Sequence, residues 1–148
     1  MALKKPLVLS GGLITQLQSG DTLDATISET EGQVYTNGDV AGHVIGDAVY
    51  LSAADTVKKA TASAPSTTRA IAIATASIAN GVPGTYQTSG SLGGLSGLTA
   101  GAVYYLSPTT AGLLTLTPPS TLGQYVVEIG VATSTTEILI NIQAPILL

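Results

Sequence analysis

The stretch from Gly101 to Gln143 constrains the fold more than any other part of the chain. It contains short runs of β-branched, aliphatic and tyrosine residues separated by turn residues, at a spacing of about 8–12 residues. Pro118 and Pro119 end one of these runs, because proline donates no hydrogen bond to a sheet ladder. The pattern predicts an all-β fold, either a small β-barrel or a β-sandwich. The predicted strands are 103–107, 113–117, 125–132 and 137–143.

The last of these strands has a clear alternation of side chains. Ile138, Ile140 and Ile142 lie two residues apart and share one face, whereas Leu139 shares the other face with polar residues. Since successive side chains of a strand point to opposite faces, the isoleucine face is predicted to be buried in the core.

An earlier part of the chain, from Gly46 to Ser77, repeats this plan. The segment 46–52 matches 101–107 at an offset of 55 residues, 65–67 matches 119–121 at 54, and 71–75 matches 129–133 at 58. Ordered matches with a drifting offset are expected of two related β units whose loops differ in length. Chance similarity in a composition rich in Gly, Ser, Thr and Ala is the alternative. We predict two related β units in tandem.

The first copy contains three predicted strands, 48–52, 57–61 and 69–75. Lys58 and Lys59 suit an exposed edge strand, because lysine discourages pairing with further strands. The alternation of Ile71 and Ile73 with alanine favours a strand with both isoleucines on a buried face. The abundance of alanine makes a helix over 69–79 the competing interpretation.

Composition shifts suggest four segments. Residues 1–25 form an N-terminal hairpin or arm, in which 6–10 and 13–17 are β-prone and Gly11-Gly12 supplies the turn. The first β unit spans 26–88 and the second 98–148. The Gly- and Ser-rich segment 89–97 is predicted to be a flexible linker between the two units.

Charge is scarce in this sequence. Charged residues make up 9% of the 148 residues, where about 25% is usual for soluble domains, and the net charge is −4. The five basic residues are scattered, so binding to nucleic acid is not expected. No window reaches the roughly 18 apolar residues of a membrane span, so no insertion into a membrane is expected. A surface poor in charge suits a protein that is largely buried in an assembly.

The sequence contains no recognisable catalytic constellation. The chain lacks cysteine, and His43 is its single histidine, which we interpret as a residue of a turn or of the surface. The acidic residues of 21–32 lack the ligand spacing of an EF-hand, so a solvated acidic connector is favoured over a calcium site. We expect a protein that is not an enzyme and has no cofactor, metal site or catalytic residue.

Two regions carry a resemblance to a known class of proteins. The segments 97–112, 123–127 and 129–132, together with the opening segments 5–9 and 17–23, resemble β-rich modules in structural proteins of tailed bacteriophages. This resemblance implies a virion protein, most simply a capsid decoration (cement) protein. Such a protein is made in the host cytoplasm and lies on the capsid surface. The alternative is a module of a tail fibre or baseplate that binds an adaptor or a host receptor.

The resemblance also implies partners. A decoration protein binds the major capsid protein at capsomer junctions and is often a homo-oligomer, commonly a trimer. Two apolar segments near the termini are the candidate interfaces, because short apolar ends are costly to leave in water. Their residues are Pro6, Leu7, Val8 and Leu9 at the N-terminal end and Ile146, Leu147 and Leu148 at the C-terminal end.

Overall fold

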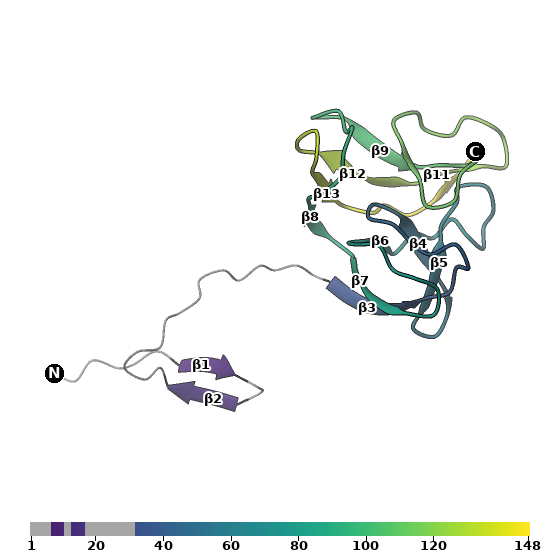
Figure 1. The fold of residues 1–148 in the computed structure, drawn as a ribbon. Coiled ribbons are helices and arrows are strands. Elements are labelled where there is room, and N and C mark those ends of the chain that lie inside the picture. Colours follow the sequence, from purple (N-terminus) through teal and green to yellow (C-terminus); the bar gives the residue numbers. More distant parts are fainter. Residues whose placement is uncertain (1–6, 11–12, 17–31) are drawn as a thin grey trace.

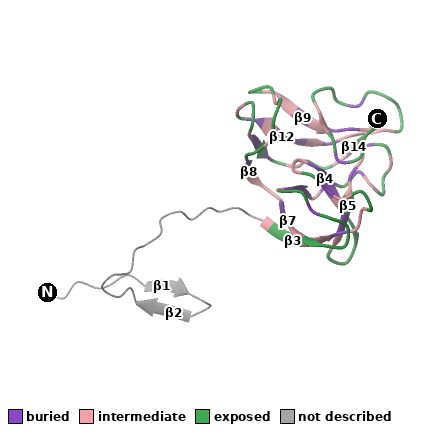
Figure 2. Ribbon diagram, in the orientation of Figure 1, coloured by how far each residue is buried: buried purple, intermediate pink, exposed green. Residues whose placement is uncertain are grey.

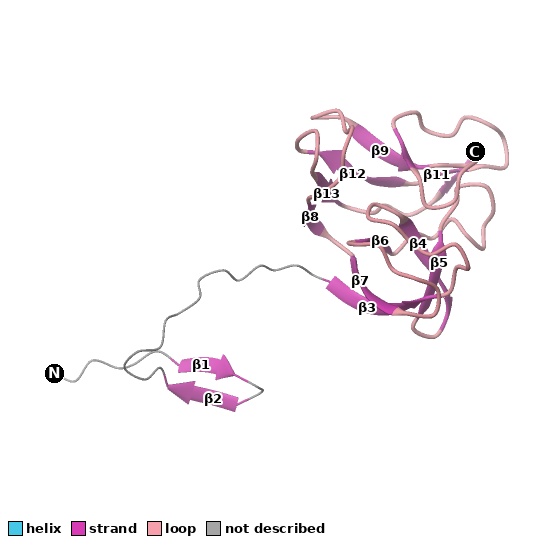
Figure 3. Ribbon diagram, in the orientation of Figure 1, coloured by secondary structure: helices cyan, strands magenta, loops and turns pink. Residues whose placement is uncertain are grey.

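The computed structural model describes the strands at 7–10 and 13–16 and the continuous chain from 32 to 148, with side chains from residue 32 onward. These described residues form strands and loops and no helix, which confirms the all-β prediction (Figures 1 and 3). The strands are β1 (Leu7–Ser10), β2 (Leu13–Gln16), β3 (Gly32–Asn37), β4 (Ala48–Ala53), β5 (Thr56–Lys59), β6 (Ala72–Ala74), β7 (Pro83–Gln87), β8 (Gly90–Leu92), β9 (Val103–Leu106), β10 (Leu114–Thr115), β11 (Tyr125–Val126), β12 (Glu128–Ala132), β13 (Ile138–Ile140) and β14 (Ile146–Leu147).

Strands β3 to β7 close into a small barrel in the order β3-β5-β4-β6-β7. Strand β3 pairs antiparallel with β7 on one side and parallel with β5 on the other, where Thr36 faces Thr56 and Asn37 faces Val57. The prediction that Lys58 and Lys59 mark an edge strand is therefore wrong. The closing contact with β3 gives β5 a neighbouring strand on each side. No local sequence pattern in β5 predicts that contact.

Five further strands form an open sheet in the order β10-β9-β12-β13-β8. Strand β8 lies inside the segment 89–97, which the sequence predicts to be a flexible linker. The segment does connect the two units, but its residues Gly90 to Leu92 pair with β13 and form one edge of the open sheet. Strands β11 and β14 pair with each other in a separate two-stranded sheet.

The barrel and the open sheet have the same strand order. Following hydrogen-bonded neighbours, the barrel reads β3, β7, β6, β4, β5, and the open sheet reads β8, β13, β12, β9, β10. Each strand of one series has the same rank along the chain as its counterpart in the other series. The difference is that β3 also pairs with β5, whereas β8 and β10 stay apart as the two edges.

The offsets found in the sequence reproduce the strand register. Ala48 faces Ile73 across β4 and β6, and Val103 faces Val131 across β9 and β12. Adding the offset of 55 to Ala48 gives Val103, and adding the offset of 58 to Ile73 gives Val131. The two pairs are therefore equivalent. The duplication predicted from sequence is therefore matched by equivalent pairing in space.

The turn that precedes the first strand of each copy is also repeated. The N–H of Gly46 donates to the carbonyl of Ala74 at 2.9 Å, and that of Gly101 donates to the carbonyl of Ala132 at 2.7 Å. Both glycines have positive φ, 92° and 79°, a conformation that glycine adopts without a steric penalty. Both copies of the duplicated motif thus contain a glycine turn followed by a strand.

The two units share one hydrophobic core. A single buried cluster contains Ala48 and Ile73 of the barrel together with Leu106, Ile129 and Ile138 of the open sheet, so the units pack as one body (Figure 2). Strand β6 is buried on both faces, with Ala72 and Ala74 in a second cluster that fills the barrel. Of the two isoleucines predicted to share a buried face, Ile73 is fully buried and Ile71 is partly buried against the second cluster. Of the predicted strand 69–75 only Ala72–Ala74 form a strand, and no residue of 69–79 is helical, so the helical alternative over 69–79 is wrong.

The predicted isoleucine face of the last long strand is confirmed. Ile138 and Ile140 are buried and Ile142 packs against the same cluster, whereas Leu139 on the opposite face is exposed.

The N-terminal hairpin is confirmed at the level of its backbone. Strands β1 and β2 pair antiparallel, from Ser10 facing Leu13 to Leu7 facing Gln16, as two strands joined by a two-residue connection require. Pro6, the Gly11-Gly12 turn and the acidic segment 21–31 lie outside the described residues. No helix long and apolar enough to cross a membrane occurs in the described part of the chain.

Candidate functional site

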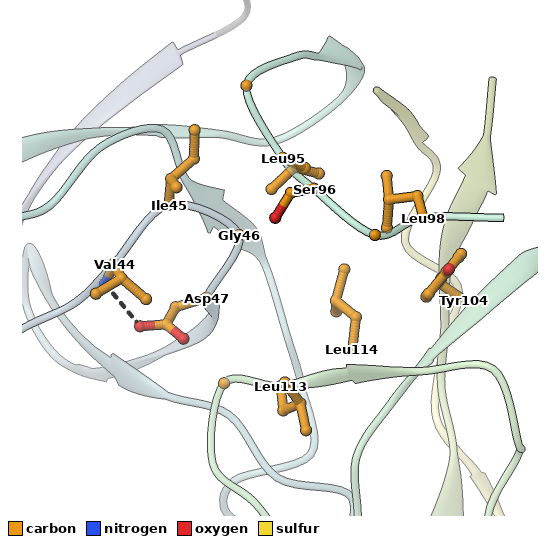
Figure 4. A pocket seen from close by; sticks show the side chains of 13 residues that line it. Val44, Ile45, Gly46, Asp47, Leu95, Ser96, Leu98, Tyr104, Leu113 and Leu114 are labelled. Atoms are coloured by element: carbon orange, nitrogen blue, oxygen red, sulfur yellow. Dashed lines mark hydrogen bonds between the residues drawn. The ribbon is translucent and has the colours of Figure 1, made fainter. Parts of the chain in front are cut away.

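A groove lies at the place where the open sheet fails to close. We call the gap between β10 and residues 94–98 the seam, and the cavity along it the seam groove. The cavity has a volume of about 320 Å³. Leu95 and Leu98 lie on one side and Leu113 and Leu114 on the other, as Figure 4 shows. The barrel loop 44–47 and Tyr104 complete the lining.

The seam is the counterpart of the closing contact of the barrel. Counting from the strand registers, Thr56 and Val57 of the barrel correspond to Leu113 and Leu114 of the open sheet. The same counting through β7 and β13 places Leu95 where the barrel has Thr36. The residues that pair in the barrel are thus replaced by residues that line the groove.

Hydrogen bonding explains why the seam stays open. The N–H groups of Leu95 and Leu98 donate to the carbonyls of Thr136 and Thr135, so this segment is held against the loop before β13. In the barrel the corresponding segment is turned toward β5 instead, where the N–H of Gly38 donates to the carbonyl of Val57 at 2.9 Å.

The backbone of Leu114 is directed into the seam. The N–H of Ser107 donates to the carbonyl of Leu113, which makes the facing residues Leu106 and Leu114 a pair without mutual hydrogen bonds. The N–H and C=O of such a residue point away from the partner strand. Leu114 therefore presents a donor and an acceptor at the edge of the sheet, beside an apolar cavity.

A second polar feature lies inside the barrel. His43 is 2% exposed, and its Nδ1 lies 2.8 Å from the hydroxyl of Tyr86 while its Nε2 lies 2.9 Å from Oδ2 of Asp39. A carboxylate can only accept, so Nε2 carries the proton, and in the neutral ring Nδ1 accepts from the Tyr86 O–H. The interpretation of His43 as a surface residue is wrong, because its two partners satisfy both ring nitrogens in the interior.

The environment of Tyr86 keeps its hydroxyl protonated. Burial first, and then the negative charges of Asp39 and Asp47, raise the pKa of Tyr86 to about 12. The side chain has no exposed surface, so no substrate atom can approach the hydroxyl. Two hydrogen bonds thus join the side chains of Asp39, His43 and Tyr86. We interpret them as bonds that stabilise the barrel interior.

Two carboxylates of the barrel also bond to the backbone. Asp39 Oδ2 accepts from the N–H of Lys59 at 2.6 Å, and Asp47 Oδ2 accepts from the N–H of Val44 at 2.8 Å. Asp47 forms an ion pair with Lys59 as well, at 2.9 Å. Among the described residues no three His, Asp or Glu side chains are grouped in a way that could hold a metal ion.

The apolar C-terminal segment is paired through its backbone but not covered. Strand β14 pairs with β11, and the N–H of Leu148 donates to the carbonyl of Gln124. The side chains of Ile146 and Leu147 nevertheless remain 64% and 60% exposed, and Leu122 in the loop before β11 is exposed too. We call Leu122, Ile146, Leu147 and Leu148 the C-terminal patch.

The structure describes side chains for the candidate interface residues at the C-terminal end but not for those at the N-terminal end. Leu7, Val8 and Leu9 form β1, of which the backbone is described, and Pro6 lies outside the described residues. The seam groove was not predicted, and its signal in the sequence is faint. The duplicated copies differ at Thr56 and Val57 against Leu113 and Leu114, where the second copy has two leucines in place of a threonine and a valine.

Comparison with known proteins adds no family to this description. No protein-family model matches the chain, and neither does any curated protein or any solved structure.

Proposed function

We propose that this chain is a structural protein of a tailed-bacteriophage virion, a capsid decoration protein that binds the major capsid protein at junctions between capsomers. In this role it acts as a homo-oligomer, a trimer in the simplest arrangement, on the capsid surface after synthesis in the host cytoplasm. It works by binding and has no catalytic activity. The proposal starts from the resemblance of segments 5–9, 17–23, 97–112, 123–127 and 129–132 to β-rich phage modules.

The observation that carries the proposal is the C-terminal patch. Its four apolar residues belong to β14, the residue after it and the loop before β11, and Ile146 and Leu147 are more than half exposed on the two faces of the β11–β14 sheet. Several large apolar side chains left exposed at one end of a fold are a common mark of a protein interface. Covering it would remove apolar area from water, which contributes about 25 cal/mol per Å².

The scarcity of charge supports the same function. Charged residues make up 9% of the chain, so few ionic groups need to be desolvated when its surface is covered by a shell. Burying an unpaired charge at an interface is costly, whereas burying threonine, serine and aliphatic groups costs little if hydrogen bonds are retained.

Binding to expanded capsids that lack the protein tests the proposal. The purified chain is mixed with such capsids, and the bound fraction is measured by co-sedimentation over a range of concentrations. We expect saturable binding. Ile146→Lys together with Leu147→Lys should weaken it at least about tenfold, since two cations would enter an apolar contact.

Val40→Lys is the matched control, because Val40 is 94% exposed and lies in the loop after β3 of the barrel, outside the C-terminal patch. This variant should bind like the unmodified chain. Absence of capsid binding, combined with binding to isolated tails, would contradict the proposal and favour the tail-fibre or baseplate alternative.

A further inference from the structure

The seam of the open sheet has the features of a site for strand addition. The edge strand β10 ends the sheet, the N–H and C=O of Leu114 point into the seam, and an apolar groove of about 320 Å³ lies beside them. Peptides that add to a sheet edge gain main-chain hydrogen bonds and place alternate side chains in such pockets. The barrel provides an internal precedent, since there β3 occupies the equivalent edge of β5.

The chain itself contains a strand pair without a further partner sheet. Among the described residues β1 and β2 pair only with each other, and their sequences, Leu-Val-Leu-Ser and Leu-Ile-Thr-Gln, are largely apolar. An isolated two-stranded hairpin is marginally stable in water and gains stability when a third strand is added. Each of its strands retains one edge that can pair.

The length of the intervening chain allows the hairpin to reach a neighbouring molecule. Fifteen residues separate Gln16 of β2 from Gly32 of β3, and an extended chain of that length spans roughly 50 Å. Within a single chain the hairpin is not paired with β10, and the seam remains open. These observations favour a second copy of the chain as the source of the added strand.

We propose that the β1–β2 hairpin of one copy adds to the β10 edge of another copy and fills its seam groove. The added strand takes the place that β3 takes in the barrel, pairing with the N–H and C=O of Leu114 and placing apolar side chains among Leu95, Leu98 and Leu113. A contact of this type links two unlike surfaces, so reciprocal exchange gives a dimer and successive exchange gives a closed ring. The trimer implied by the resemblance to decoration proteins is one such ring.

This inference deepens the proposed function by naming the contact between copies, but it does not require a capsid. Self-association is measured on the purified chain alone, and capsid binding is measured separately. Loss of one without the other therefore distinguishes failure of the strand exchange from failure of the decoration role.

Cysteine cross-linking is the direct test, because the chain contains no cysteine of its own. A chain with Val8→Cys is mixed with a chain carrying Thr115→Cys, and a short bifunctional maleimide is added. We expect a cross-linked product of twice the chain mass on a denaturing gel. The control is Lys58→Cys, which occupies the position equivalent to Thr115 on the closed edge of β5 and should give no such product.

Two outcomes would overturn the proposal. One is the absence of a product with Thr115→Cys while circular dichroism shows both variants folded. The other is a doubly substituted chain, Val8→Cys with Thr115→Cys, that cross-links within single molecules at high dilution and forms no product between molecules. The second outcome would assign the hairpin to the seam of its own chain.

Light scattering on the full chain provides an independent measurement. Leu113→Lys introduces a charge into the seam groove, whereas Leu139→Lys introduces one on β13 of the same sheet, outside the groove. The two leucines are similarly exposed, at 52% and 47%. We expect Leu113→Lys to raise the dissociation constant between copies at least about tenfold and Leu139→Lys to leave it unchanged. Equal effects of both variants would contradict the proposal.

Discussion

In the barrel, the end of β3 reaches β5 and closes the sheet, whereas in the open sheet the corresponding segment bonds to the loop 133–137 and leaves β10 at an edge. Strand order is otherwise the same in the two units, and the pairing of β4 with β6 is equivalent to that of β9 with β12. The difference shows that the repeated motif does not by itself determine whether its sheet closes into a barrel. Closure depends on where one short segment finds partners for its backbone N–H groups.

The interiors of the two units differ in a related way. Register places Ile138 of the open sheet where the barrel has Tyr86. The barrel uses that tyrosine to bond His43, which in turn bonds Asp39, whereas the open sheet fills the position with an aliphatic side chain that joins the shared core. One register thus supports a polar interior in one copy and an apolar interior in the other.

The largest expected effect concerns the equivalent positions Ala72 and Gly130. A methyl group added at Gly130 would overlap the carbonyl oxygen of Leu139, which is backbone and cannot rotate away. Gly130→Ala should therefore lower the free energy of unfolding by about 3 kcal/mol or more, because the backbone has to shift. Ala72→Gly, the reverse change in the barrel, should cost only about 1–2 kcal/mol through backbone entropy and a lost methyl group. Urea unfolding measures both, and equal losses would refute the equivalence of the two sites.

A smaller effect is expected at Tyr86, and it depends on pH. Tyr86→Phe leaves Nδ1 of His43 without its donor, which should cost about 1–3 kcal/mol near neutral pH. Because the folded-state pKa of about 12 lies above the usual value of 10, the folded state disfavours the tyrosinate. The contribution of protonated Tyr86 to the free energy of unfolding is therefore fully present below pH 10 and is lost as the pH rises through 12.

Chemical unfolding at pH 8 to 12 checks this dependence. The loss of stability that Tyr86 contributes on going to alkaline pH should be absent from Tyr86→Phe. Ile138→Val, at the equivalent position of the open sheet, is the control, with a cost of about 0.5–1.5 kcal/mol and the same alkaline loss as the unmodified chain. An unchanged alkaline loss in Tyr86→Phe would show that Tyr86 does not contribute it.

The smallest effects are expected in the hairpin turns of the two copies. Asp55 and Gly112 occupy equivalent positions, and both have positive φ, 50° and 81°. Asp55→Gly should change the free energy of unfolding by less than about 1 kcal/mol, because relief of backbone strain is offset by the entropy of glycine. Gly112→Ala should cost about 1–2 kcal/mol, since the methyl group would meet Oδ1 of Asp47 as well. Thermal melts compare the two, and a larger cost for Asp55→Gly would contradict the equivalence.

Several features of the fold follow from local patterns. The isoleucine face of β13 follows from its alternation, and the pairing of β1 with β2 is predicted by two β-prone runs that lie close together in the sequence. The ordered offsets between the copies anticipate the equivalent registers of β4 and β9 with their neighbours. The candidate site was harder to anticipate. The apolar end of the sequence predicts Ile146, Leu147 and Leu148 of the C-terminal patch but not Leu122, and the seam groove depends on segments that lie far apart in sequence.

By itself, then, the sequence determined strand spacing, the duplication and which face of β13 is buried, because these depend on residue order within a few positions. Tertiary structure alone decided that β5 is enclosed, that His43 is buried between Asp39 and Tyr86, and that the second copy remains open at Leu114. The physical reason is that closure depends on backbone hydrogen bonds between residues about 20 positions apart in the barrel. Threonine, valine and leucine at the closing positions are all acceptable strand residues, so their identities do not reveal which pairing forms.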